Sequence, residues 1–105
     1  MAWLMLVLAG LFEVVWAIGM KYSAGFTRLW PSIITFVGAI VSFVLLSAAM
    51  RSIPLGTAYT IWTGIGAVGA FVAGVIMLGE QLSTMRVVAA VLIVSGLVLM
   101  KLSAD

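Results

Sequence analysis

The chain has 105 residues, of which 66% are hydrophobic and 8% are charged, and its mean hydropathy is +1.38. A soluble domain of this size keeps too much of its surface in water to carry this composition, so the sequence predicts an integral membrane protein. Five Lys and Arg residues and a net charge of +2 do not indicate a nucleic-acid-binding surface. Because the chain has no Cys and no His, we expect no metal site and no cofactor.

Four apolar segments follow one another along the chain, at residues about 3–20, 30–50, 55–78 and 85–102. Each is long enough to cross a hydrocarbon layer of about 30 Å. Helices satisfy every backbone group within one segment, and these runs are too long and uniformly apolar for barrel strands. The sequence therefore predicts an all-α fold, a single four-helix transmembrane domain covering residues 1–105.

The connections between the segments are short. Residues 51–54 leave only a tight turn between the second and third segments, so these should be antiparallel neighbours. Gly79 is suited to the left-handed residue that ends a helix, and Ser83 or Thr84 is suited to capping the next one. Almost nothing is expected to lie outside the membrane.

The loop cations give a weak orientation signal. Arg51 and Lys101 fall on one side of the membrane, and Lys21, Arg28 and Arg86 fall on the other. Three cations against two is a small bias under the positive-inside rule. We expect insertion in both orientations and an antiparallel dual-topology homodimer; one fixed orientation is the alternative.

Glu13 is the polar residue that most needs an explanation, because it lies near the middle of the first apolar segment. A charge at that depth costs at least a few kcal/mol, and the segments supply no Lys or Arg at a matching depth. An intramembrane carboxylate of this kind is functional by default, and it attracts a cation or a proton.

Several other polar or aromatic residues lie at a similar depth. Tyr59 and Trp62 share one face of the third segment, because they are three residues apart, and Ser42 lies mid-way along the second. Gly10 and Trp16 share a stripe with Glu13. We expect these residues to form a cation site around Glu13, where indole, phenol and hydroxyl groups donate hydrogen bonds to the carboxylate and aromatic faces attract the ligand.

Each of these residues also has a more ordinary explanation. Trp and Tyr often anchor a helix at the membrane interface, which we accept for Trp3 and Trp30. Ser42 alone fits a helix-packing hydroxyl. Gly64 and Gly66 predict either a hinge in the third segment or a close helix contact.

Four motifs resemble the small multidrug resistance family of bacterial proton-coupled exporters, and the resemblance covers all four segments. They are Ala9-Gly10-x-x-Glu13-x-x-Trp16, residues 21–28, Pro54-x-Gly56-x-Ala58-Tyr59-x-x-Trp62-x-Gly64-x-Gly66, and Gly79-Glu80. Trp16 and Ser42 resemble the guanidinium-exporter branch of that family. Thr60 departs from the Ala that the family more usually carries.

The resemblance implies a multi-pass protein of the bacterial inner membrane that exports guanidinium ion against proton entry, by alternating access in an antiparallel homodimer. It implies that substrate and protons compete for the Glu13 carboxylates of both subunits. Ser42, Tyr59 and Trp62 would order those carboxylates, and Trp16 would line the site.

Other functions remain open on the sequence. A broader exporter of quaternary ammonium cations is the near alternative, and a small dimeric ion channel or a subunit of a membrane complex is the alternative from another class. We do not expect an enzyme, because the sequence has one intramembrane carboxylate, no His, no Cys and no soluble domain, and so offers few groups that could catalyse a reaction.

Overall fold

A computed structural model describes residues 1–104, and all of its regular structure is helical. The helices are α1 (Ala2–Tyr22), α2 (Leu29–Ala49), α3 (Leu55–Leu78) and α4 (Thr84–Ala104). All four are long and apolar enough to cross a membrane, which confirms the four predicted spans. The predicted bounds differ from the observed ones by no more than about two residues, which is the usual uncertainty at helix ends.

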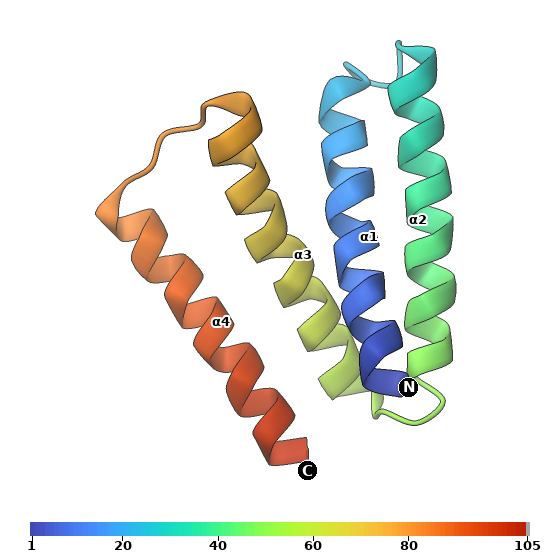
Figure 1. The fold of residues 1–105 in the computed structure, drawn as a ribbon, viewed down its shortest axis with the longest axis vertical. Helices are drawn as coiled ribbons and strands as arrows, with labels where there is room; N and C mark the ends of the chain where they lie inside the picture. Colours follow the sequence, from blue (N-terminus) through green and yellow to red (C-terminus); the bar gives the residue numbers. More distant parts are fainter. Residues whose placement is uncertain (105) are drawn as a thin grey trace.

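The helices lie largely in one layer, in the order α2, α1, α3, α4 (Figure 1), and α3 also reaches α2, where Trp62 bonds to Ser42. The chain ends share one edge of this layer with the α2–α3 turn, and the other two loops lie at the opposite edge. The molecule measures 42 × 35 × 17 Å. Its thinnest dimension is less than two helix diameters of about 10–12 Å, so the four helices of one chain do not form a closed bundle.

The loop between α3 and α4 begins as the sequence predicts. Gly79 has φ 66° and ψ 26°, in the left-handed region, and it ends α3. The backbone N–H of Glu80 then donates a hydrogen bond to the carbonyl of Gly74, 3.1 Å away. At the start of α4 the hydroxyl of Ser83 accepts a hydrogen bond from the N–H of Arg86, so Ser83 is the capping residue.

The buried core lies in the half of the layer nearest the chain ends, between α1, α2 and α3. Its apolar members are Leu6, Ala9, Leu46, Ala49, Ile53, Ala58, Ile61 and Trp62. The described part of α4 contributes no buried residue, and its backbone lies close to α3 alone. Most of the apolar surface is therefore available to lipid or to a second chain.

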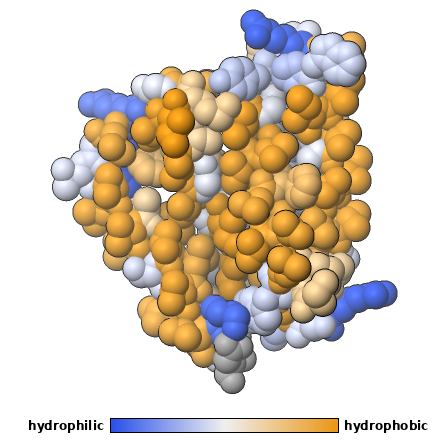
Figure 2. Space-filling view, viewed as in Figure 1, coloured by the Kyte–Doolittle hydropathy of each residue, from blue (hydrophilic) through white to orange (hydrophobic). Residues whose placement is uncertain are grey.

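The outer surface carries the polarity expected of a membrane protein. Figure 2 shows an apolar band across the middle of all the helices, with hydrophilic residues gathered at the two edges. The edge with the chain ends carries Arg51 and Lys101, and the other carries Lys21, Arg28 and Arg86. Lys101 lies over the ring of Trp3, 4.5 Å from its centroid, and this contact ties the end of α4 to the start of α1.

Candidate functional site

The carboxyl group of Glu13 points from the middle of α1 toward α3. It lies directly against the Cα of Gly66, where an added Cβ would collide with Glu13 Oε1. Only glycine at position 66 leaves room for the acid at this depth. Oε1 is buried and has no hydrogen-bond partner among the described residues. An acceptor in such a position normally finds a donor, so Oε1 is an exception among buried polar atoms and makes Glu13 the candidate binding residue.

Trp16 lies on the other side of α1 and packs on α2. Its backbone N and Cβ lie within 3.2–3.3 Å of where a Cβ on Gly38 would stand, so that glycine allows the two helices to approach. The indole Nε1 of Trp16 is buried and has no hydrogen-bond partner among residues 1–104. The two sides of α1 therefore each carry a buried polar atom without a partner among the described residues, an acceptor on Glu13 and a donor on Trp16.

Ser42 and Trp62 form a separate hydrogen-bonded chain between helices. The Nε1–H of Trp62 donates to Ser42 Oγ at 2.9 Å, and the Ser42 hydroxyl donates to the carbonyl of Ala9 at 2.6 Å. Ser42 is fully buried and Trp62 is 7% exposed. These bonds join α3 to α2 and α2 to α1 about one helical turn before Glu13, at the level of Ala9 on α1.

A row of aromatic rings connects these residues. The centroids of Trp16 and Phe43 are 6.4 Å apart, those of Phe43 and Trp62 are 5.8 Å apart, and those of Trp62 and Tyr59 are 5.6 Å apart. All the pairs are tilted, as aromatic pairs prefer. Tyr59 ends the row and is 53% exposed. The row thus runs from Trp16 of α1 through Phe43 of α2 to the two rings of α3, and aromatic faces attract cations.

The structure thus brings the predicted residues near one another, but their contacts differ in detail from the expected ring of donors. Ser42 and Trp62 bond to each other and to Ala9, and no hydrogen bond within the described chain joins either of them to Glu13. The predicted ordering of the carboxylate by Ser42, Tyr59 and Trp62 therefore stays a prediction.

Phe43 is the site residue that the sequence analysis missed. It follows Ser42 directly, and its ring lies between those of Trp16 and Trp62. Its position next to Ser42, a hydroxyl residue near the middle of the second apolar segment, was the one feature of the sequence that could have identified it. An isolated Phe in an apolar helix is otherwise indistinguishable from a lipid-facing residue.

The three glycines predicted to be special all lie at close helix contacts. A Cβ on Gly10 would come within 2.7 Å of Ile65 Cβ, so α1 and α3 approach there. Gly64 faces Leu97 of α4, and Gly66 faces Glu13. Helix α3 runs unbroken through both of the latter positions. Their role as a hinge is untested, and their contacts give each a packing role in this conformation.

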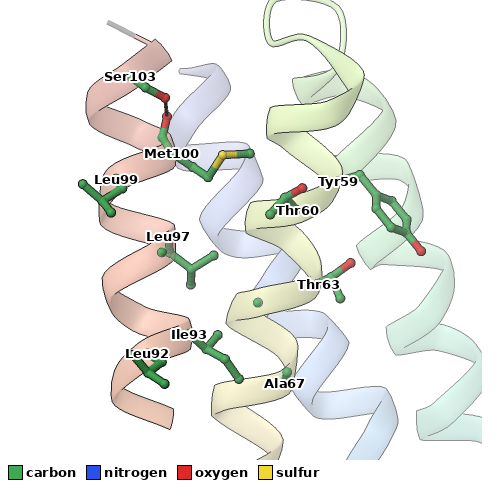
Figure 3. Close-up of a pocket in the computed structure, with 12 residues that line it drawn as sticks. Tyr59, Thr60, Thr63, Ala67, Leu92, Ile93, Leu97, Leu99, Met100 and Ser103 are labelled. Atoms are coloured by element: carbon green, nitrogen blue, oxygen red, sulfur yellow. Dashed lines mark hydrogen bonds between the residues drawn. The ribbon is translucent and has the colours of Figure 1, made fainter. Parts of the chain in front are cut away.

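A cavity of about 790 Å³ lies between α3 and α4 (Figure 3). It is lined mainly by apolar residues, with hydroxyl groups from Thr60, Thr63 and Ser103. The ring of Tyr59 points away from α4 in this view. Glu13 does not line this cavity, so its volume does not identify the cation site.

The chemistry available at the site is that of one carboxyl group among aromatic faces. Within residues 1–104, no three acidic, His or Cys side chains gather to hold a metal ion. The acceptor on Glu13 suits a proton or a cation that carries N–H donors, and the aromatic row suits a flat or apolar cation.

Comparison with known proteins gives a consistent result. The family of Small Multidrug Resistance proteins matches residues 1–93. The chain is 58% identical over 103 residues to a guanidinium exporter of Citrobacter freundii and to one of Salmonella typhimurium, and 56% identical to one of Escherichia coli strain K12. In each case the alignment covers 98% of both chains.

Proposed function

Since this chain belongs to the family of Small Multidrug Resistance proteins, we propose that it exports guanidinium ion in exchange for protons. It is a multi-pass protein of the bacterial inner membrane. Its role is transport rather than catalysis. The relatives that are guanidinium exporters align along almost the whole chain, so the same cation is the first choice of substrate here.

The observation that carries the proposal is the unpartnered Oε1 of Glu13, buried at the α1–α3 contact. Guanidinium is planar and presents pairs of parallel N–H groups, which match the two oxygens of a carboxylate. A proton satisfies the same oxygen atom. The two ligands therefore compete for one group, and that competition couples the flow of one to the flow of the other.

The aromatic row explains why a flat cation is favoured. The rings of Trp16, Phe43 and Trp62 follow one another beside the carboxyl-bearing stretch of α1. Their negative π faces attract a cation more strongly where water is excluded. The Nε1–H of Trp16 is a donor, so it suits a carboxylate oxygen in the site; guanidinium, which has only donors, would meet the ring face of Trp16 instead.

The transporter is proposed to be an antiparallel dual-topology homodimer. One chain forms a single layer 17 Å thick, and α4 presents a largely exposed apolar surface. Two layers facing each other would enclose the Glu13 side chains between them. If the two chains are inverted, exchanging their conformations turns an outward-open dimer into an inward-open one.

In this mechanism the two Glu13 carboxyl groups bind either protons or guanidinium, and only a loaded dimer exchanges sides. Protons enter from the side of higher concentration and displace the cation, which leaves to that side. Two close carboxyl groups titrate as one coupled pair, so proton release is a property of the dimer.

The test is guanidinium uptake into proteoliposomes under an imposed pH gradient. We expect uphill accumulation by the unaltered protein, which a channel cannot produce, and no accumulation by Glu13→Gln. Glu13→Asp keeps the charge and should transport with a shifted pH dependence. Guanidinium binding should weaken as the pH falls, by about tenfold per pH unit for each proton displaced. Proton-driven uptake by the Glu13→Gln protein would refute the mechanism.

A further inference from the structure

A second cavity lies between α1 and α3, on the membrane side of the α3–α4 loop. Its volume is about 140 Å³, and its charged members are Lys21 and Glu80. The rest of its lining is apolar: Ala17, Ile18, Ala70, Ala73, Gly74, Met77 and Leu78. Four of these residues are Ala or Gly, and their small size leaves the space open.

This cavity continues the line of contact on which Glu13 lies. Glu13, Ala17 and Lys21 are spaced by four residues on α1, so they share one face of that helix. On α3, Gly66 faces Glu13, and Ala70 and Gly74 follow at the same spacing. The cavity therefore lies between the Glu13 carboxyl group and the edge of the molecule to which both the end of α1 and the α3–α4 loop belong (Figure 1).

Glu80 is held at the mouth of the cavity by the backbone. The left-handed Gly79 turns the chain back over α3, and the Glu80 N–H bonds to the Gly74 carbonyl. The carboxylate then lies over Gly74, where a Cβ would stand 2.6 Å from Oε1 and 2.9 Å from Oε2. The Gly79-Glu80 motif thus directs a carboxylate onto this cavity, although the loop itself is exposed.

Lys21 occupies the α1 side of the same mouth. It lies in the last turn of α1, and in this conformation no ion pair joins it to Glu80 within the described chain. Opposite charges on the two rims attract across the opening. A small movement of α1 toward α3 would shorten that separation and narrow the cavity.

We propose that Lys21 and Glu80 form an electrostatic latch that closes this end of the path to Glu13. The inference rests on the proposed transport function and adds the residues that control access from one membrane face. In an inverted pair of chains, each face of the membrane receives one such mouth. One latch closed and the other open is then the asymmetry that alternating access requires.

The test measures the access of a small reagent to the cavity. The chain has no cysteine, so Ala73→Cys places a single thiol on the lining. Its reaction with iodoacetamide, which is uncharged, is followed in lipid nanodiscs that expose both faces. An ion pair at an exposed site is weak, so we expect Glu80→Gln or Lys21→Gln to raise the rate about two- to fivefold.

Matched variants separate the latch from simpler effects. Lys21→Arg and the exchange of Lys21→Glu with Glu80→Lys preserve the pair and should keep the low rate. Arg86→Gln removes a cation from the same edge but from another cavity, and should change nothing. A direct effect of charge on thiol ionisation has opposite signs for the two neutral variants, whereas the latch predicts an increase in both.

Salt gives an independent check, because it screens exposed charges. The rate in the reference protein should rise with NaCl, and the rates in the neutral variants should not. The latch is wrong if neither neutral variant speeds the reaction, or if the exchanged pair reacts as fast as the single variants. If guanidinium transport in proteoliposomes fails while the iodoacetamide rates of the variants change as expected, guanidinium is not the substrate but the latch is established.

Discussion

The indole N–H of Trp62 donates a hydrogen bond to the hydroxyl of Ser42, 2.9 Å away, and the Ser42 hydroxyl donates a hydrogen bond to the carbonyl of Ala9. One buried hydroxyl therefore links three helices at the level of the site. Because the Ser42 hydroxyl donates its hydrogen bond to the Ala9 carbonyl, it does not donate one to Glu13 in this conformation. The hydrogen bonds that join these helices therefore leave Oε1 of Glu13 without a partner among the described residues.

Ser42→Ala should destabilise the protein by about 1–2 kcal/mol, because it leaves the Trp62 N–H without its acceptor in a buried setting. Thermal unfolding of the purified protein in detergent measures the loss. Ser47→Ala is the matched control, since Ser47 lies on the same helix and is exposed. Equal stability of the two variants would show that the hydrogen bond from Trp62 contributes nothing.

Gly66→Ala should abolish guanidinium transport, because the added methyl group would occupy the position of the Glu13 carboxyl group. The measurement is uptake by proteoliposomes, with guanidinium binding to the detergent-solubilised protein as a second readout. Gly96→Ala adds the same methyl group where no atom of the chain lies within 4 Å, so its thermal unfolding in detergent is the control for the effect of a methyl group on helix stability. Normal binding by Gly66→Ala would mean that the contact with Glu13 does not hold the carboxyl group in the functional state.

Trp16→Gly should lower the apparent affinity for guanidinium by about tenfold, the loss of one desolvated cation–π contact. It also opens space beside Phe43 and Gly38, so a quaternary ammonium ion such as tetraethylammonium should become an effective competitor. Competition assays at constant pH compare the two cations. Trp16→Phe keeps an aromatic ring, so its affinity for guanidinium should be intermediate between those of the unaltered protein and Trp16→Gly. Unchanged selectivity in Trp16→Gly would show that this residue does not determine which cation is bound.

A reporter fused to the C-terminus should be found on both sides of the membrane, because the cations at the two edges are nearly balanced. Gln81→Lys adds a cation to the edge opposite the chain ends, so the reporter should shift to the outside. Ser52→Lys combined with Arg86→Gln reverses the imbalance and should shift it to the cytoplasm. Gln81→Glu is the control, since acidic residues contribute little to orientation; a reporter confined to one side in the unaltered protein would exclude dual topology.

Much of the fold could be predicted from the sequence because a membrane limits the choices. Backbone groups in lipid must bond within their own segment, so four apolar runs of sufficient length become four helices with nearly the predicted ends. Gly79 and Ser83 were predictable for an equally local reason, since each satisfies backbone groups at a helix end. Glu13 was identifiable because a lone carboxyl group at that depth is costly.

The contacts of the site residues were decided only by the tertiary structure. Glu13 and Trp16 share a stripe on α1, yet Glu13 meets Gly66 of α3 and Trp16 meets Gly38 of α2. Phe43 joins the aromatic row, and Lys21 and Glu80 line the same cavity, without any pattern in the sequence that pairs them. The physical reason is that these helices are apolar on every side, so hydropathy does not fix their rotation. Which face meets which neighbour depends instead on where small residues let two backbones approach, and that is a property of the packed helices together.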